Sequence, residues 1–280
     1  MGITDTGFFD LMLCNVCERD KDSMFSVLNI FRTLVLLSLA LNASVSLADL
    51  EGKRPKPQGW FWGFGAGYTE SIYKEKGNDF IPIPAIGYIG ESLEFYGPFA
   101  NYKVYDQDAY SAKLKLAVRF DGYEADDSNF LAGMDDRDRS LDGGFSLGYQ
   151  PKDIARFEVS YLHDVLGKHK GSETRFQISR QFNKGPFFFV PEVSAHYLDA
   201  DLIDYYYGVK SSEATAQRSA YEGRSGWNYR ADFNFSTPIL FGGFTRIDLG
   251  YIWYANEISD SPIVDETEGY NIRFAYTRFF

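Results

Sequence analysis

Hydrophobic and polar residues alternate along most of the chain beyond residue 58. In "WNYRADFNFS" (227–236), apolar residues take every second position and polar residues take the positions between them. "AYSAKLKLAVRFDG" (109–122) and the closing "YNIRFAYTRFF" (270–280) alternate in the same way, interrupted in the closing segment by Arg278. Successive side chains of a strand point to opposite faces. The pattern therefore predicts strands with one apolar and one polar face.

The predicted strands have the length that a tilted strand needs to cross a bilayer, about ten residues. Eleven segments qualify: 59–70, 79–90, 92–104, 109–122, 138–149, 154–163, 172–182, 186–198, 226–238, 241–254 and 268–280. Bacterial single-chain barrels have an even number of strands, so a twelfth is expected, with 200–225 as its candidate. The predicted fold class is all-β: a single transmembrane antiparallel β-barrel of twelve strands, with ten as the alternative.

A soluble β-sandwich would show the same alternation in any one strand. Its core rows would be mostly aliphatic, whereas these rows carry Tyr, Trp and Phe near their ends, and aromatic residues make up 18% of the chain. Aromatic girdles of this kind are typical of membrane barrels. The sequence therefore favours the barrel. Its long connections, 123–137, 164–171, 199–225 and 255–267, are predicted to be polar loops.

Residues 24–48 have the features of a signal peptide. Arg32 precedes an apolar run, 33–41, which is shorter than the ~20 residues of a spanning helix. Ser46-Leu47-Ala48 supplies the small-x-small pattern of a cleavage site, so we expect cleavage between Ala48 and Asp49.

The predicted cleavage divides the chain into three parts. Residues 1–23 are expected to be a non-native or unstructured extension, with Met24 as an alternative start to Met1; residues 49–280 are the predicted barrel. Both cysteines, Cys14 and Cys17, lie in the extension. A mature chain without cysteine fits an exported protein that does not rely on disulfides.

The net charge of the chain indicates which partners are disfavoured. The chain carries 39 acidic and 28 basic residues, a net charge of −11. Nucleic acid is disfavoured as a partner, because phosphate binding needs a basic face. In a barrel the polar rows would face the lumen. The rows place both signs of charge there, which predicts a lumen crossed by ion pairs rather than a single-sign filter: Lys113, Lys115, Arg119, Asp121, Arg230 and Asp232.

Two serine–histidine pairs were considered as hydrolytic sites. Ser194 and His196 share one strand face, whereas Ser160 and His163 lie on opposite faces. A hydrolytic triad needs a third group that orients the imidazole, and none is evident in the sequence. We therefore expect no enzymatic activity and predict no catalytic residue.

Metal and phosphate sites are also disfavoured. His163, Asp164 and His169 lack a further ligand and are interpreted as solvated loop residues. The stretch 135–139, "DDRDR", lacks the glycine and terminal glutamate of a calcium loop. Its aspartates are expected to pair with its arginines and neighbouring residues, or to bind divalent ions weakly beside lipopolysaccharide. "GFGAG" (63–67) is interpreted as a glycine-rich strand and not as a phosphate-binding loop, because no helix follows it. The sequence therefore predicts no metal and no cofactor.

Several segments resemble the MipA/OmpV family of outer-membrane proteins. The most specific are "LAGMDDRDR" (131–139), "YYYGV" (205–209) and "SPIV" (261–264), and the resemblance covers residues 59–280. It implies a barrel in the outer membrane of a Gram-negative bacterium. It also implies a scaffold that links a lytic transglycosylase to a penicillin-binding protein in peptidoglycan remodelling. A porin-like channel or a surface adhesin is the alternative, and a lipid-modifying barrel enzyme is a more remote one. The family defines no catalytic residues.

The last strand has the form of an assembly signal. Barrels are recognised by the barrel-assembly machinery through a final strand that ends in an aromatic residue, with apolar residues at alternate positions before it. Phe280, Tyr276, Phe274 and Ile272 fit this pattern. The final strand is also expected to pair with the first, near 60–68, because an open edge in lipid would leave backbone groups unsatisfied. Outer-membrane lipid and lipopolysaccharide would then surround the wall.

Overall fold

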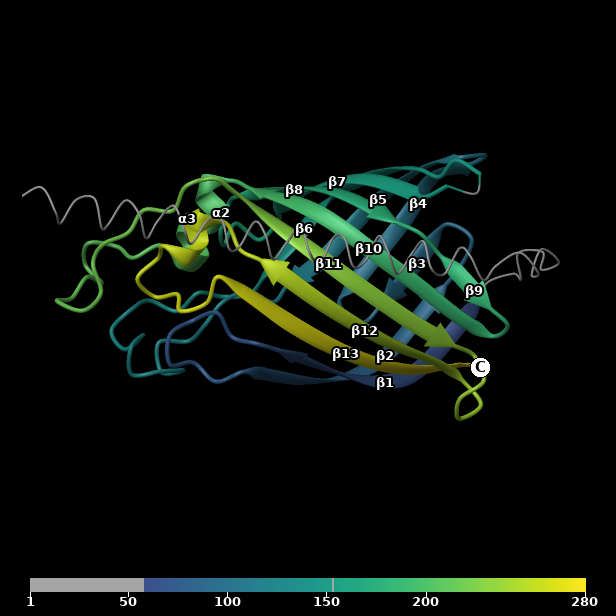
Figure 1. Ribbon diagram of the computed structural model, residues 1–280, viewed down its shortest axis with the longest axis horizontal. Helices are drawn as coiled ribbons and strands as arrows, with labels where there is room; N and C mark the ends of the chain where they lie inside the picture. The colour runs from purple at the N-terminus through teal and green to yellow at the C-terminus, as the bar shows by residue number, and fades with distance from the viewer. Residues whose placement is uncertain (1–57, 153) are drawn as a thin grey trace, which may run out of the picture. The chain divides into compact units, whose positions relative to one another are not determined.

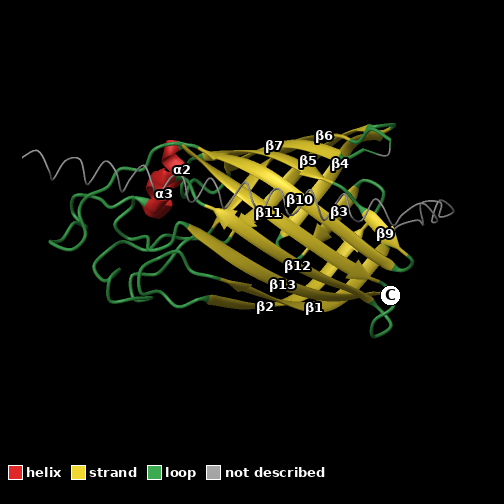
Figure 2. Ribbon diagram, in the orientation of Figure 1, coloured by secondary structure: helices red, strands yellow, loops and turns green. Residues whose placement is uncertain are grey.

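The computed structural model describes residues 58–152 and 154–280. The predicted extension, signal peptide and Ala48–Asp49 cleavage site lie outside these residues. The described residues form an antiparallel β-barrel (Figures 1 and 2). Its strands are β1 (Gly59–Thr69), β2 (Asp79–Ile89), β3 (Leu93–Tyr96), β4 (Phe99–Gln107), β5 (Tyr110–Arg119), β6 (Ser140–Tyr149), β7 (Arg156–Asp164), β8 (Ser172–Ser179), β9 (Phe182–Lys184), β10 (Phe187–Leu198), β11 (Gly226–Thr237), β12 (Phe244–Trp253) and β13 (Glu268–Phe279).

The wall of the barrel has twelve strands, as predicted. β8 and β9 both pair with β10 and are separated only by residues 180–181, so together they occupy one position in the wall. β10 also pairs with β11, and the sheet continues through β12 and β13 to β1. Each of the twelve wall positions therefore pairs with a strand on both sides over at least part of its length, and the wall closes.

The predicted pairing between the last and first strands is confirmed. β13 lies antiparallel to β1, with Phe279 opposite Phe61 and Asn271 opposite Thr69. The Phe280 amide donates a hydrogen bond to the Trp60 carbonyl oxygen over 3.1 Å. On the outer face the Phe64 and Tyr276 rings lie 5.5 Å apart between centroids. An aromatic layer thus covers the closing seam.

The segment predicted as one strand, 92–104, is two strands. β3 and β4 form a hairpin whose tip is Gly97–Pro98. Gly97 has a φ of 53°, which glycine adopts at little cost, and Pro98 has no amide hydrogen for a ladder. This hairpin supplies the twelfth strand, so its predicted location in 200–225 is wrong.

Residues 200–207 form helix α2 (Ala200–Tyr207) instead of a strand. The Asp199 carboxylate caps it by accepting a hydrogen bond from the Leu202 amide over 3.0 Å. Apolar side chains recur at helical spacing and are buried on one face: Leu202, Ile203, Tyr206 and Tyr207. A short helix, α3 (Asn256–Ser259), lies in the connection between β12 and β13. No helix of the described residues is long and apolar enough to cross a membrane.

The main hydrophobic core lies at one end of the barrel wall, largely in connections predicted to be polar loops, with further members from the β1–β2 loop and the end of β10. Its buried members are Ile72, Tyr73, Tyr123, Leu131, Met134, Leu198, Leu202, Ile203, Tyr206, Tyr207, Val209, Ala255, Ile258, Ile263 and Val264. We call this cluster the cap. The long connections and both helices gather at one end of the barrel, and the C-terminus lies at the other (Figure 2). Because membrane barrels carry long loops outside and short turns in the periplasm, the cap covers the extracellular mouth.

Candidate functional site

Rings from distant loops hold the cap together. Tyr73, between β1 and β2, meets Tyr123, after β5, with ring centroids 4.8 Å apart. The Tyr73 ring also stacks on Tyr207 of α2 at 5.8 Å. Ser261, between β12 and β13, donates its hydroxyl hydrogen to the Tyr207 carbonyl oxygen over 2.6 Å. All three sequence segments that carry the family resemblance, 131–139, 205–209 and 261–264, contribute buried residues to this cap.

A buried ion pair joins two of these loops. The Arg137 guanidinium and the Glu213 carboxylate lie 2.9 Å apart, and each side chain is 4% exposed. Glu213 also accepts hydrogen bonds from the Asp135 and Lys210 amides over 3.0 and 2.9 Å. Burial alone would raise the pKa of Glu213, but these hydrogen bonds and Arg137 together hold the pKa below its ordinary value. Glu213 is therefore ionised, and its carboxylate is bound by Arg137 and by two backbone amides.

The predicted pairing within 135–139 is wrong. Arg137 pairs with Glu213, while Asp135 pairs with Lys210 over 2.6 Å and Asp138 with Lys168 over 2.5 Å. The partners come from other loops because the cap folds these segments against one another. These ion pairs therefore connect different loops of the cap.

The lumen carries the mixed charges that the sequence predicts. Arg119 of β5 reaches Asp142 of β6 over 2.7 Å and Glu173 of β8 over 2.5 Å. Further ion pairs lie elsewhere in the wall, among them Lys115–Glu158 at 3.3 Å, Arg230–Asp232 at 3.0 Å and Arg246–Asp248 at 2.7 Å. The predicted mixture of charges and their ion pairing are confirmed, but these pairs join residues on the same strand or on nearby strands. Such a lumen lacks a single-sign path for ions.

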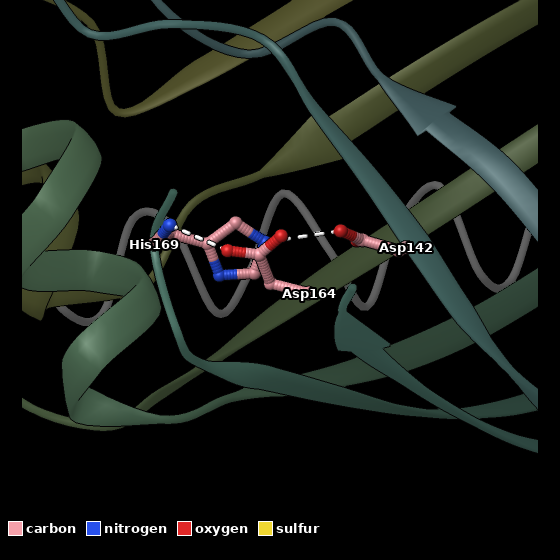
Figure 3. A group of neighbouring side chains, drawn as sticks. All are labelled: Asp142, Asp164 and His169. Carbon is pink, nitrogen blue, oxygen red and sulfur yellow. Dashed lines mark hydrogen bonds and ion pairs between the residues drawn. The ribbon is translucent and has the colours of Figure 1, made fainter. Parts of the chain in front are cut away.

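Asp142, Asp164 and His169 form a buried cluster in which the ligand atoms lie within 4.8 Å of one another (Figure 3). The expectation that Asp164 and His169 are solvated is wrong, and His163 lies apart from them on an exposed position. Asp164 accepts hydrogen bonds from four backbone amides of residues 166–170. His169 accepts one from the Gly171 amide through Nδ1, so Nε2 carries the hydrogen donated to Asp142 over 3.0 Å. These hydrogen bonds hold the three side chains of the cluster in place.

The structure supplies a third group beside Ser194 and His196. The Ser194 hydroxyl lies 2.9 Å from His196 Nε2, and His196 Nδ1 lies 2.7 Å from the Glu173 carboxylate. Since a carboxylate accepts, Nδ1 is assigned as the donor, which leaves Nε2 free to accept from the serine. This is the hydrogen-bond order of a hydrolytic triad. Sequence reasoning missed Glu173 because it depends on the register between β8 and β10.

Glu173 has structural partners as well. Its carboxylate accepts hydrogen bonds from Arg119 over 2.5 Å and from Arg175 over 2.7 Å. These contacts tie β5, β8 and β10 together just below the cap. The arrangement can therefore brace the wall, and it can also orient an imidazole beside a serine.

The predicted assembly residues lie on the outer face and at the end of the last strand. Ile272, Phe274 and Tyr276 lie opposite Tyr68, Ala66 and Phe64 of the closing seam. The Phe280 side chain is 88% exposed at the periplasmic end. Their role as an assembly signal stays a prediction.

The chain is similar to known proteins in sequence. The family model described as MltA-interacting protein MipA matches residues 62–280. Outer membrane protein OmpV of Vibrio cholerae is 27% identical over 208 residues, which cover 74% of this chain and 80% of the relative. MltA-interacting protein of Escherichia coli strain K12 is 25% identical over 243 residues, 84% of this chain and 93% of the relative. A NanC porin structure aligns with a TM-score of 0.44 at 11% identity, over 78% of this chain and 99% of that one.

Proposed function

The chain belongs to the MltA-interacting protein MipA family, and we propose that it is an outer-membrane scaffold for a peptidoglycan-remodelling enzyme. The observation that carries the proposal is the closed mouth. A diffusion channel needs a continuous wet path, whereas here a hydrophobic core covers the extracellular end and charges of both signs pair with each other in the lumen. The name of the 25% identical relative, MltA-interacting protein, supports a lytic transglycosylase as the partner.

The periplasmic end offers a contact surface for such an enzyme. The turn between β11 and β12 exposes apolar side chains at Ile239, Leu240 and Phe241. The Tyr276 hydroxyl donates to the Phe241 carbonyl oxygen over 2.9 Å, which fixes the turn against the wall. A fixed apolar patch facing the periplasm is the kind of surface on which a protein partner docks.

Crosslinking in intact cells tests the scaffold, with the co-purified proteins identified by mass spectrometry. We expect a lytic transglycosylase and a penicillin-binding protein to be recovered. Replacing Ile239 and Leu240 by serine should reduce that recovery, while Ile154→Ser, an equally exposed change in another turn, should leave it unchanged. Recovery of neither enzyme, together with single-channel conductance of the purified barrel, would instead establish the diffusion channel.

A second candidate function, hydrolysis of an ester, is favoured by the Ser194–His196–Glu173 chain. His196 would take the serine proton as the oxygen attacks the ester carbonyl, and would return it to the departing alcohol. Water would then cleave the acyl-serine by the reverse sequence of proton transfers. The three side chains already have the hydrogen-bond order that this reaction needs.

A fluorophosphonate probe, which modifies activated serines, tests this candidate. If the triad is active, the folded protein is labelled and Ser194→Ala abolishes the label. Ser160→Ala should not, because Ser160 is also buried but lies opposite Ser146 and Arg175, with His163 on the other face of its strand. A protein that stays unlabelled, or labelling that survives Ser194→Ala, would leave the three residues with a bracing role only.

A further inference from the structure

The hydrogen-bonded wall has a break in its extracellular half. β3 pairs with β2 only at residues 87–89, and the hairpin turns back at Gly97–Pro98. β2 continues beyond that point toward the cap, and its residues 79–85 have no strand partner on the β3 side within the described chain. On the other flank the hairpin tip reaches β5 near its end, where the Val118 amide donates to the Pro98 carbonyl oxygen over 3.3 Å.

The free edge of β2 carries acceptors and almost no donors. The Gly97 amide donates to the Ile86 carbonyl oxygen over 3.4 Å, so even-numbered residues of β2 direct their backbone groups toward β3. Backbone groups alternate sides along an antiparallel strand. Pro82 and Pro84 therefore face the break, and neither has an amide hydrogen. The backbone amide of Phe80 is the one remaining donor among residues 79–85 on this edge. The acceptors are the carbonyl oxygens of Phe80, Pro82 and Pro84.

Prolines in these positions protect the edge from pairing with another strand, because a strand needs alternating donors and acceptors. Bare carbonyl groups are costly in lipid unless water or a donor reaches them. The break must therefore be wet from the lumen or occupied by a molecule that carries donors. An acyl chain alone meets neither requirement.

The rim of the break is amphipathic. Phe80 and Ile86 are 67% and 63% exposed on the lipid face of β2. On the opposite flank the Phe99 and Phe120 ring centroids lie 6.3 Å apart. The Arg139 guanidinium lies 5.6 Å from the Phe120 ring centroid and so places a cation beside this flank of the break. The Tyr73 and Tyr123 rings, 4.8 Å apart between centroids, join the loop between β1 and β2 to the loop after β5.

The inner surface of the wall beside the break is apolar. Odd-numbered residues of β2 point inward, so Ile81, Ile83 and Ala85 form the inner surface beside the break. Glycines 63, 65 and 67 of β1 lie opposite residues 85, 83 and 81 and share this inner face. Gly63 and Gly65 let β13 approach β1 closely, because a Cβ at either position would meet the carbonyl oxygen of Tyr276 or Phe274.

We propose that this break is a lateral portal through which an anionic amphiphile of the outer leaflet places its polar head in the lumen while its acyl chains stay in the membrane. Hydroxyl or amide donors of the head group would serve the carbonyl oxygens of residues 80, 82 and 84. Arg139 would attract its phosphate. A strand from another protein is disfavoured by the two prolines. The portal is independent of the scaffold, because it concerns the wall and not the periplasmic face.

Cysteine labelling tests the portal, since both native cysteines precede the predicted cleavage site. The protein is placed in vesicles that contain a phospholipid with a maleimide on its head group, a net anionic lipid. Ile83→Cys, inside the lumen beside the break, should be labelled. Ala275→Cys, which also points inward but lies on a strand paired on both sides, should stay at the background of the cysteine-free barrel. Arg139→Gln should slow the labelling of Ile83→Cys.

Sealing the break provides the decisive comparison. Replacing Pro82 and Pro84 by valine and inserting Val-Thr on each side of Gly97–Pro98 extends the hairpin along β2. The sealed barrel, checked by its heat-modifiable gel mobility, should lose lipid labelling at Ile83→Cys but still react with a small water-soluble maleimide. Labelling that persists after sealing, or an unsealed barrel in which only the water-soluble reagent reacts, would overturn the portal. Disulfide-linked dimers of Phe80→Cys would overturn it too, by showing that a second copy covers the edge.

Discussion

Replacing Arg137 by alanine should open the extracellular mouth of the barrel. The change leaves the Glu213 carboxylate buried without its cation, and breaking a buried ion pair in this way costs about 3–5 kcal/mol. That cost falls on the cap, because Arg137 and Glu213 join the loop after β5 to the loop after α2. We expect the variant to show single-channel conductance in planar bilayers and faster proteolysis of its loops, while its heat-modifiable mobility stays that of a folded barrel.

Lys168→Ala is the matched control for this experiment. Lys168 also forms an ion pair in the cap, with Asp138, but both side chains are largely exposed, and exposed pairs contribute little. The control should conduct no more than the parent. If Arg137→Ala and Lys168→Ala behave alike, the cap does not depend on the buried pair.

Acid should act on the cap in the same direction as the Arg137 substitution. The pKa of Glu213 is lower in the folded protein than its unfolded value of about 4.3. A lowered folded-state pKa means that the pair contributes fully above the unfolded value and is lost as pH falls through the folded-state pKa. Conductance of the parent protein should therefore rise below about pH 4, and Glu213→Gln should weaken this dependence.

The wall was predictable from the sequence because its environment is simple. Lipid on one side and a wet lumen on the other require apolar and polar residues to alternate with a period of two. This alternation can be recognised in each strand separately. The β3–β4 hairpin escaped this reasoning because its turn takes only Gly97 and Pro98 and the apolar rows continue on both sides of it. A strand as short as β3 carries too few positions for a period to show.

The cap was hidden for a different reason. Asp199 and the spacing of Leu202, Ile203 and Tyr206 are helix signals, but the need for an even strand number favoured a strand there. The contacts of Tyr73 with Tyr123 and Tyr207 join segments far apart in the chain, and no local pattern reports them. The same holds for Glu173 beside His196, which follows from strand register.

Deleting Phe280 should sharply lower the amount of protein assembled in the outer membrane, although the folded barrel hardly needs this residue. Its side chain is 88% exposed, and its backbone adds one hydrogen bond, from its amide to the Trp60 carbonyl oxygen over 3.1 Å. Loss of one such bond costs only about 0.5–1.5 kcal/mol. A large loss of assembly with little loss of stability would therefore identify Phe280 as a recognition element for the barrel-assembly machinery.

Phe241→Ala provides the control for this deletion. Phe241 is an equally large ring, 80% exposed at the same end of the barrel, and lies outside the last strand. Both proteins are compared by heat-modifiable mobility in outer-membrane fractions, and by refolding of the purified chains into lipid vesicles. Equal assembly of the two in cells would show that the terminal ring is incidental. Equally poor refolding of the deletion in vesicles would show that Phe280 acts through the β1–β13 seam, because vesicles contain no machinery to recognise it.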